Sequence, residues 1–136
     1  MAERRPDRVL GPGHDAFWAW CDEGELRLQR CGACRRISWP VVAACEYCGG
    51  VELSWDRMSG RGKVVSWCTF ERDYFRGVLP LPWATLLVEL EEGALFVSNP
   101  RGFTPDDCRL DQAVKVCFVD CEDSGGHFRL PVFEKL

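Results

Sequence analysis

The stretch that decides the fold is Cys31-Gly-Ala-Cys34-Arg-Arg-Ile-Ser-Trp-Pro-Val-Val-Ala-Ala-Cys45-Glu-Tyr-Cys48, which holds two C-x-x-C pairs ten residues apart. Each pair forms a tight turn that directs two thiolates to one point, and two such turns together offer the four sulfurs of a tetrahedral zinc site. All four positions are Cys, so no ligand position is left for water, and the site is structural rather than catalytic. We predict one structural Zn²⁺ bound by Cys31, Cys34, Cys45 and Cys48.

The residues also allow other functions for the cysteines. A redox C-x-x-C needs only one pair at the start of a helix, which fits this stretch poorly. A rubredoxin-like iron site shares the four-thiolate geometry, so an iron electron carrier remains an alternative. The remaining cysteines are scattered singly, and we expect small buried hydrophobic residues at Cys21, Cys68, Cys108, Cys117 and Cys121.

The residues before and around the cysteine pairs predict a short helix followed by a small ribbon. Residues 1–25 form an N-terminal arm and an aromatic helix that starts at Asp15 and stops at Gly24. Phe17, Trp18 and Cys21 share one face of that helix. Residues 26–55 form the ribbon, with strands at 26–29 and 36–39, and a segment this short cannot fold without a cross-link.

Residues 56–136 change to the alternating pattern of strands. Runs at 63–70, 83–91, 94–98, 113–120 and 127–133 are separated by turns and by an irregular loop at 99–111. In the first run we expect Val64, Ser66, Cys68 and Phe70 on one face. Gly60-Arg-Gly62 reads as a strained turn into the first strand. Five short strands fit a Greek-key barrel of the OB type, with a small open sandwich as the fallback. The predicted fold is therefore mainly β: an N-terminal helix, a rubredoxin-like zinc ribbon and a five-stranded OB-fold barrel.

Charge and hydropathy restrict the class of protein. The net charge of the 136 residues is −4, and residues 54–136 carry ten Lys or Arg against thirteen acidic residues. Ribbons and OB barrels both bind single-stranded nucleic acid, but a basic excess would be expected for that function. Nucleic-acid binding is thus an alternative that the acidic barrel disfavours. No apolar run reaches the roughly 20 residues of a membrane span, and the charged start does not resemble a secretion signal, so we expect a cytoplasmic protein.

Two apolar segments are candidates for partner binding. An exposed loop that carries Phe75, Leu79, Leu81 and Trp83 would be unusual unless something covers it. Phe17 and Trp18 of the helix either pack on the chain's own barrel or dock on a partner, and the residues leave both open. No catalytic constellation is recognisable, since His14 and His127 are the only histidines and have no partner of obvious spacing.

Taken in order, these motifs resemble a known family. The order is Phe17-Trp18, Gly24-Glu-Leu26, the two C-x-x-C pairs, Ser59-Gly-Arg-Gly62, Pro82-Trp83 and Val88-Glu-Leu-Glu-Glu-Gly93. It is similar to the zinc-ribbon OB-fold proteins known as domain-of-unknown-function family thirty-five, from about residue 13 to 134. The second cysteine pair departs from the family, where it usually contains Pro, by having Glu46-Tyr47.

The resemblance implies a function beside other enzymes. Members work as non-catalytic accessory subunits of thiolase-like enzymes that act on acyl-CoA thioesters, in acyl transfer or in aldol cleavage of steroid side chains. They complete assembly and help to form the substrate or CoA channel, so contact with acyl-CoA is indirect. Related domains accompany enoyl-CoA hydratase-like subunits. On this chain the resemblance places the metal ligands at the four paired cysteines and partner-facing roles at Phe17, Trp18 and the 75–83 loop.

Overall fold

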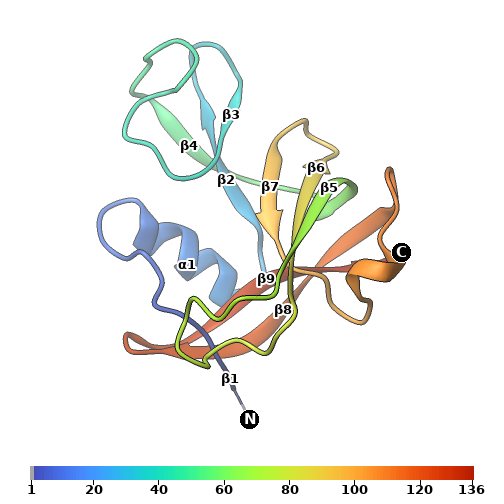
Figure 1. Ribbon diagram of the computed structural model, residues 1–136. Coiled ribbons are helices and arrows are strands. Elements are labelled where there is room, and N and C mark those ends of the chain that lie inside the picture. Colours follow the sequence, from blue (N-terminus) through green and yellow to red (C-terminus); the bar gives the residue numbers. More distant parts are fainter. Residues whose placement is uncertain (1) are drawn as a thin grey trace.

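The structure is a computed structural model that describes residues 2–136, and it consists of a small ribbon sheet, one helix and a larger sheet that curls into a barrel (Figure 1). The elements are β1 (Glu3–Arg4), α1 (His14–Asp22), β2 (Arg27–Cys31), β3 (Ile37–Ser38), β4 (Leu53–Arg57), β5 (Arg61–Phe70), β6 (Trp83–Leu90), β7 (Leu95–Ser98), η1 (Pro105–Asp107), β8 (Ala113–Asp123) and β9 (Gly126–Lys135). The predicted mainly-β fold class is confirmed.

The ribbon is an antiparallel sheet in the order β3-β2-β4. The loop between β3 and β4 carries the second cysteine pair and has little regular structure of its own. Gln29 of β2 holds this loop, because its buried side chain donates to the Val42 carbonyl at 3.0 Å and accepts the Val42 N–H at 2.9 Å. A buried amide with both of its polar ends paired fixes where the loop leaves the sheet.

The larger sheet has the order β1-β8-β5-β6-β7, with β9 paired to β8. The barrel closes where β7 meets β9, and there the contact is narrow: a single parallel bridge joins Pro100 to Phe133. Ser98 of β7 also donates to the Pro131 carbonyl of β9 at 2.8 Å. On the side of Phe96 and Phe128, a gap in the barrel wall is lined by residues of both strands. Helix α1 packs against β9 beside this gap (Figure 1).

The barrel core follows the alternation expected from the sequence. In β6, Ala84, Leu86, Val88 and Leu90 are buried while the residues between them are partly exposed. Phe133 of β9 is fully buried and packs on Phe96 of β7 at 6.1 Å between ring centroids. The core continues without interruption into α1 and the ribbon, so the three parts share one apolar cluster.

The expectation for β5 is wrong beyond Val64. A β-bulge at Val65 shifts the register against β6, so that Val64 pairs with Val88 but Ser66 already pairs with Leu87. After this extra residue the inward face passes to Trp67, which packs on the core, and Cys68 and Phe70 are exposed. Cys68 is therefore not the small buried residue that we expected.

Helix α1 begins two residues earlier than predicted, because Asp15 is not its N-cap. Gly13 occupies the N-cap position, and Asp15 lies in the first turn, where its carboxylate accepts the Gly11 N–H at 2.9 Å. Gly24 has φ +76°, a left-handed conformation that ends the helix as expected. Within residues 2–136, no helix has the length and apolar character needed to cross a membrane.

Candidate functional site

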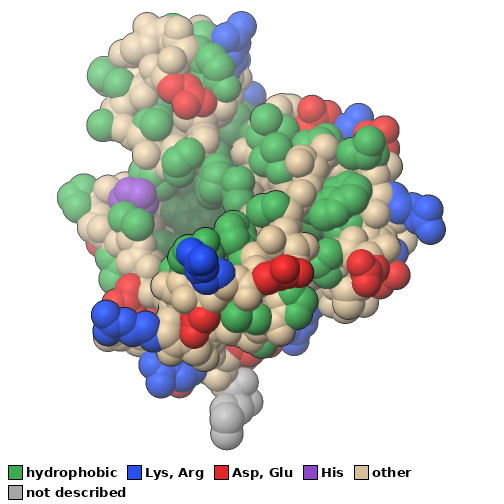
Figure 2. Space-filling model, in the orientation of Figure 1, with side chains coloured by type: hydrophobic (Ala, Val, Ile, Leu, Met, Phe, Trp, Pro, Cys, Tyr) green, Lys and Arg blue, Asp and Glu red, His purple; other side chains and the backbone are tan. Residues whose placement is uncertain are grey.

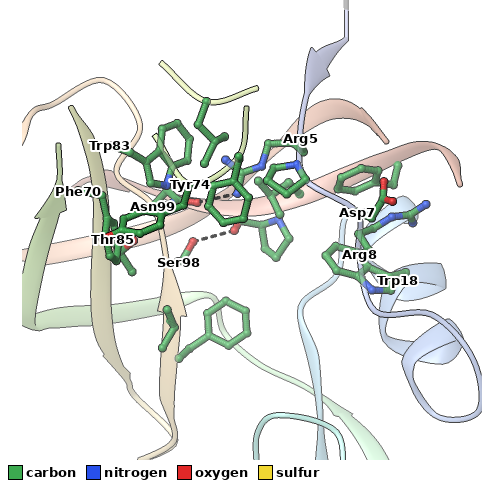
Figure 3. Close-up of a pocket in the computed structure, with 18 of the residues that line it drawn as sticks. Arg5, Asp7, Arg8, Trp18, Phe70, Tyr74, Trp83, Thr85, Ser98 and Asn99 are labelled. Carbon is green, nitrogen blue, oxygen red and sulfur yellow. Dashed lines mark hydrogen bonds between the residues drawn. The ribbon is translucent and has the colours of Figure 1, made fainter. Parts of the chain in front are cut away.

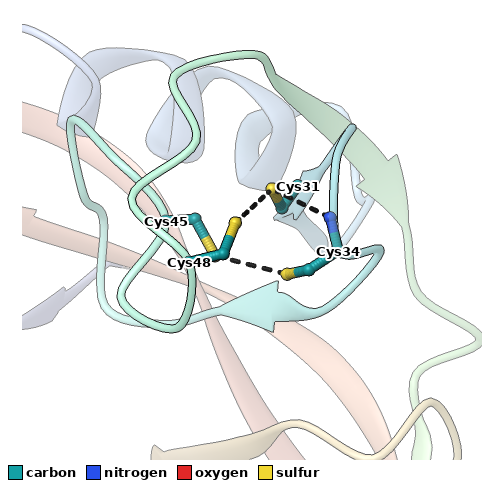
Figure 4. A group of neighbouring side chains, drawn as sticks. All are labelled: Cys31, Cys34, Cys45 and Cys48. Atoms are coloured by element: carbon teal, nitrogen blue, oxygen red, sulfur yellow. Dashed lines mark hydrogen bonds between the residues drawn. The ribbon is translucent and has the colours of Figure 1, made fainter.

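The four paired cysteines converge at the tip of the ribbon, from two turns that face each other (Figure 4). Their sulfur atoms all lie within 4.8 Å of one another. Cys31 Sγ is 3.5 Å from Cys48 Sγ, and Cys34 Sγ is 3.6 Å from Cys45 Sγ. Four thiolates bound at about 2.3 Å to one tetrahedral ion stand about 3.8 Å apart, so the arrangement fits zinc with a small adjustment.

Backbone amides support the thiolate form of these sulfurs. The N–H groups of Cys34 and Ala33 donate to Cys31 Sγ at 3.5 and 3.4 Å, and they lower the pKa of that thiol to about 6. The N–H of Tyr47 likewise donates to Cys45 Sγ at 3.4 Å and is the main cause of its lowered pKa. Zinc binds thiolates, so this hydrogen bonding prepares the site for the ion.

Gly50 is a further requirement of the site that the sequence did not single out. A Cβ at Gly50 would lie 3.1 Å from Cys31 Sγ and 3.4 Å from Cys48 Sγ. A side chain at this position would therefore crowd two of the sulfur atoms and require them to shift slightly. The donor set and this close wall fit a closed, four-coordinate structural zinc site, in which Cys31, Cys34, Cys45 and Cys48 hold the ion.

A second feature is a cavity of about 700 Å³ at the gap between β7 and β9. Figure 2 shows the corresponding hollow, lined by hydrophobic side chains, between the ribbon, α1 and the barrel. Its walls come mainly from six parts of the chain: the N-terminal arm, α1, Trp39 of the ribbon, the 70–83 loop, β7 and β9.

All six residues predicted to face a partner line this cavity: Phe17, Trp18, Phe75, Leu79, Leu81 and Trp83. Their exposure differs. Phe17 and Leu79 are buried, Trp18 and Trp83 are half-buried, and Phe75 and Leu81 are exposed. Phe17 and Leu79 therefore form inner walls, and the accessible apolar surface lies at the rim of the cavity.

The cavity walls are braced by contacts between aromatic rings. Trp18 makes edge-to-face contacts with Phe17 and Phe128, at 5.0 and 5.3 Å between ring centroids. Phe17 also lies 6.3 Å from Phe96, on which Trp39 packs at 4.7 Å. Rings held by neighbouring rings cannot easily fold into the empty space, so the cavity is largely preformed.

Two arginines of the N-terminal arm are polar elements of the walls, and their situations differ (Figure 3). Arg8 is neutralised: its guanidinium pairs with Asp123 at 2.8 Å and lies 4.0 Å from the centre of the Phe128 ring. Arg5 lies 4.7 Å from the Trp83 ring centre and donates to Asn99 Oδ1 at 3.3 Å. Among the described residues, no carboxylate lies within ion-pair distance of Arg5. Burial lowers the pKa of Arg5, which remains charged.

Sequence reasoning missed the role of the arm. Residues 2–10 carry no hydrophobic periodicity, and their anchors are far away in the chain: β1 pairs with β8 at Cys121 and Glu122, and Arg8 reaches Asp123. The arm lies along β8 and β9 and closes one side of the cavity (Figures 1 and 3).

The Arg8–Asp123 pair gives a test of how the arm is held. Hydrogen bonds from the Arg8 side chain lower the pKa of Asp123 to about 2, and the Asp123 side chain is only 1% exposed. Because this folded-state pKa lies below the unfolded value of about 3.9, the stabilisation is present above pH 4 and is lost as the pH falls toward 2. We expect Asp123→Asn to lower the free energy of unfolding by about 2 kcal/mol at pH 7.

Urea unfolding of both proteins from pH 7 to 3 measures this effect, since loss of zinc in acid affects both alike. The difference in unfolding free energy should stay constant down to about pH 4 and then narrow. The exposed Asp106→Asn is the control and should change stability by less than about 0.5 kcal/mol. If the wild type and Asp123→Asn had the same unfolding free energy at pH 7, the Arg8–Asp123 pair would not hold the arm.

Most of the other cysteines behave as expected. Cys21, Cys108 and Cys121 are buried, and burial raises the pKa of Cys21 to about 12 and that of Cys121 to about 11. Thiols with raised pKa values make poor nucleophiles. In the ribbon, Arg27 pairs with Glu25 at 2.9 Å and Arg30 pairs with Asp56 at 2.8 Å, so both guanidinium groups already have a carboxylate partner.

The chain matches the models of two domains of one known protein family. Residues 18–54 match the model of the ChsH2 rubredoxin-like zinc ribbon domain, and residues 55–119 match that of the ChsH2 C-terminal OB-fold domain. A solved structure described as the Ltp2-ChsH2(DUF35) aldolase superposes with a TM-score of 0.81 at 25% identity, over 95% of this chain and 98% of that one. A DUF35-family protein of unknown function from Sulfolobus solfataricus, 16% identical with a TM-score of 0.62 over 93% of this chain and 87% of that one, shares the fold.

Two curated relatives are longer proteins. One is the "3-oxo-4,17-pregnadiene-20-carboxyl-CoA hydratase alpha subunit" of Mycobacterium tuberculosis, 30% identical over 122 residues. The other is the "Probable enoyl-CoA hydratase alpha subunit" of Thermomonospora curvata, 28% identical over 120 residues. The matches cover 87% and 88% of this chain but only 39% and 36% of the relatives.

Fold and site therefore define a protein with a structural zinc ribbon joined to an OB-fold barrel. The match to the zinc ribbon model together with the four clustered cysteines supports zinc as the metal. The chain belongs to the ChsH2-type zinc-ribbon and OB-fold family, also called DUF35.

Proposed function

We propose that this protein is a non-catalytic accessory subunit of a thiolase-like enzyme. That enzyme breaks a carbon–carbon bond in the acyl group of an acyl-CoA by a retro-aldol reaction, during degradation of steroid side chains. The observation that carries the proposal is the match to the Ltp2-ChsH2(DUF35) aldolase, which extends over nearly the full length of both chains. The steroid setting is supported by the name of the Mycobacterium tuberculosis relative, a hydratase subunit for a pregnadiene-carboxyl-CoA.

The surface suited to docking is the rim of the cavity, which we define as Phe70, Tyr74, Phe75, Leu81 and Val97. These side chains are 42–63% exposed, and all of them line the cavity. A contiguous apolar surface of this kind is unfavourable in water and marks an interaction site. Aromatic side chains on such a surface are the usual carriers of binding energy between proteins.

The role of the chain in the complex follows from this placement. Docking at the rim would bury the exposed rings and place the opening of the cavity against the thiolase-like subunit. The subunit that carries the nucleophile would then share a covered, apolar passage with this chain. The zinc ribbon would serve as a rigid frame, because its shared core with α1 and the barrel fixes the ribbon wall of the cavity.

An enoyl-CoA hydratase-like subunit is a second partner that chemistry supports. Hydration of an enoyl thioester yields a 3-hydroxyacyl thioester, and a retro-aldol reaction consumes that product. Both curated relatives are named as hydratase alpha subunits, although this chain spans little more than a third of each. We place the complex in the cytoplasm, where a reducing environment keeps the zinc-binding cysteines and the single cysteines from forming disulfides.

The proposal is tested by assembly and activity. The chain is co-expressed with a thiolase-like protein, and complex formation is measured by size-exclusion chromatography and calorimetry, with aldol cleavage of a steroid acyl-CoA as the readout of activity. We expect a stable complex, and cleavage by the thiolase-like protein only in its presence. A chain that stays monomeric and leaves cleavage unchanged would contradict the proposal.

Variants of the rim locate the interface. We expect Phe75→Ser and Leu81→Ser each to weaken the complex at least tenfold, because each removes an exposed apolar side chain that docking would bury. Leu110→Ser is the control, since Leu110 is an even more exposed apolar side chain that lies in the 99–111 loop and does not line the cavity. Zinc content and thermal unfolding should match the wild type in all three variants. Equal weakening by Leu110→Ser would place the interface elsewhere.

A further inference from the structure

We infer that the cavity itself binds a rigid polycyclic acyl group of the steroid type, with Arg5 as the contact for its carboxylate or thioester oxygen. The inference rests on the proposed function for the choice of a steroid, and it goes further by assigning the ring system to a site within this chain.

The size of the cavity fits a ligand rather than a packing defect. Its volume of about 700 Å³ lies in the range of small-molecule sites, about 300–1,000 Å³. Apolar voids in protein interiors are usually far smaller, because side chains move in to fill them. Here the lining rings are held by one another, which opposes such a collapse.

The walls favour a flat, rigid apolar body. The lining rings form one continuous series of ring contacts, which runs through Trp39, Phe96, Phe17, Trp18 and Phe128. Because these rings are already fixed, binding requires little ordering of side chains. A fused ring system likewise loses little conformational freedom on entering, whereas a long flexible chain would lose much more.

Arg5 supplies the charge that a purely apolar site would lack. Its guanidinium lies on the face of Trp83 and donates to one oxygen of Asn99 (Figure 3), which leaves most of its five N–H donors for another acceptor. Arg8, the other buried arginine of the arm, is already satisfied by Asp123. A half-buried guanidinium without a carboxylate partner among the described residues is complementary to an anionic or strongly accepting group.

Together these features specify the ligand class. The apolar rings lie among Trp18, Phe96 and Phe128, and the acyl carboxylate or thioester oxygen lies at Arg5, near the rim. This orientation directs the reactive end of the acyl group outward, toward the surface that we propose for docking. The nucleophile of the partner would thus meet the acyl side chain of the steroid, while this chain holds the steroid rings.

The test uses the full-length chain alone and three probes: 3-oxo-4-pregnene-20-carboxylate, progesterone as a neutral steroid, and palmitate as a flexible acid. Binding is followed by quenching of tryptophan fluorescence, since Trp18, Trp39 and Trp83 line the cavity, and stoichiometry by calorimetry. We expect one steroid acid per chain, bound at least tenfold more tightly than palmitate. Absence of saturable steroid binding, or preference for palmitate, would overturn the inference.

Two variants assign the site. Arg5→Gln should weaken binding of the steroid acid about tenfold or more and change progesterone binding less than twofold, because only the acid offers a charge to Arg5. Leu130→Trp, which enlarges a side chain of the cavity wall, should abolish binding of both steroids. The exposed Arg109→Gln is the matched control and should bind as the wild type does. Equal affinity of the acid in Arg5→Gln and wild type would remove Arg5 from the site.

The result is independent of the assembly experiment. A chain that forms the complex with the thiolase-like protein but binds no steroid overturns this inference and leaves the proposed function standing. A chain that binds the steroid acid at Arg5 but forms no complex supports the inference and contradicts the proposed function. Zinc content and thermal unfolding of each variant show whether a loss of binding reflects a loss of fold.

Discussion

Cys31→Ser should yield a chain that no longer holds zinc and whose ribbon no longer folds. Cys31 Sγ accepts two backbone N–H groups and lies 3.5 Å from Cys48 Sγ, so a shorter, harder hydroxyl cannot replace it. Structural zinc contributes about 10–16 kcal/mol of apparent binding free energy in isolated zinc fingers. Because the ribbon shares one apolar cluster with α1 and the barrel, we expect the loss to exceed about 4 kcal/mol for the whole chain.

Metal analysis, limited proteolysis and urea unfolding measure this effect. The wild type should contain one zinc per chain and be colourless, while the variant should contain almost none and be cleaved between residues 32 and 52. Cys68→Ser is the control, because Cys68 is exposed and outside the cluster, and it should retain both zinc and stability. Full zinc content in Cys31→Ser would contradict the four-cysteine site. A chelator added to the wild type gives the same comparison without any substitution.

Gly62→Ala should destabilise the barrel by about 3 kcal/mol. A Cβ at Gly62 would lie 2.5 Å from the Glu89 carbonyl oxygen and 2.8 Å from Val88 Cγ1, so β5 and β6 would have to separate where they pair. The atoms in the way belong to the backbone of a central strand and to a buried side chain, and neither can move without disturbing the sheet. Chemical unfolding in urea, with zinc content checked, measures the change.

Two further substitutions show whether the destabilisation expected for Gly62→Ala comes from the close approach of β5 and β6. At Gly93 an added Cβ meets open space but φ is +95°, so Gly93→Ala should cost about 1–2 kcal/mol through backbone strain alone. Ser66→Ala changes an exposed side chain of the same strand and should have an effect below about 0.5 kcal/mol. A Gly62→Ala protein as stable as Ser66→Ala would show that β5 and β6 do not approach as closely as described.

The cysteine pairs and the alternating strands could be predicted because their signals are local. A C-x-x-C turn needs only four consecutive residues, and ten intervening residues allow two such turns to meet. The alternation in Trp83–Leu90 directly reflects burial on one face of a strand. The turn at Glu92-Gly93 likewise depends on the conformational freedom of one glycine.

The register of β5 could not be predicted in the same way. A bulge arises from how β5 fits β6, and the residues Val64-Val65-Ser66 carry no mark of it by themselves. One inserted residue was enough to turn Cys68 and Phe70 outward and Trp67 inward. The position of Gly62 against the Glu89 carbonyl has the same origin, since the sequence indicated a strained turn but not the partner strand.

From the residues alone we could predict the four candidate metal ligands, the class of fold and two unusually apolar segments, because each depends on residues close together in the chain. Only the tertiary structure decided that these segments surround one cavity, and that Arg5 of the arm stands in its wall beside Trp83. The physical reason is that a cavity exists only where strands diverge and distant elements fail to fill the space between them. That geometry is a property of packing, which no local pattern of residues encodes.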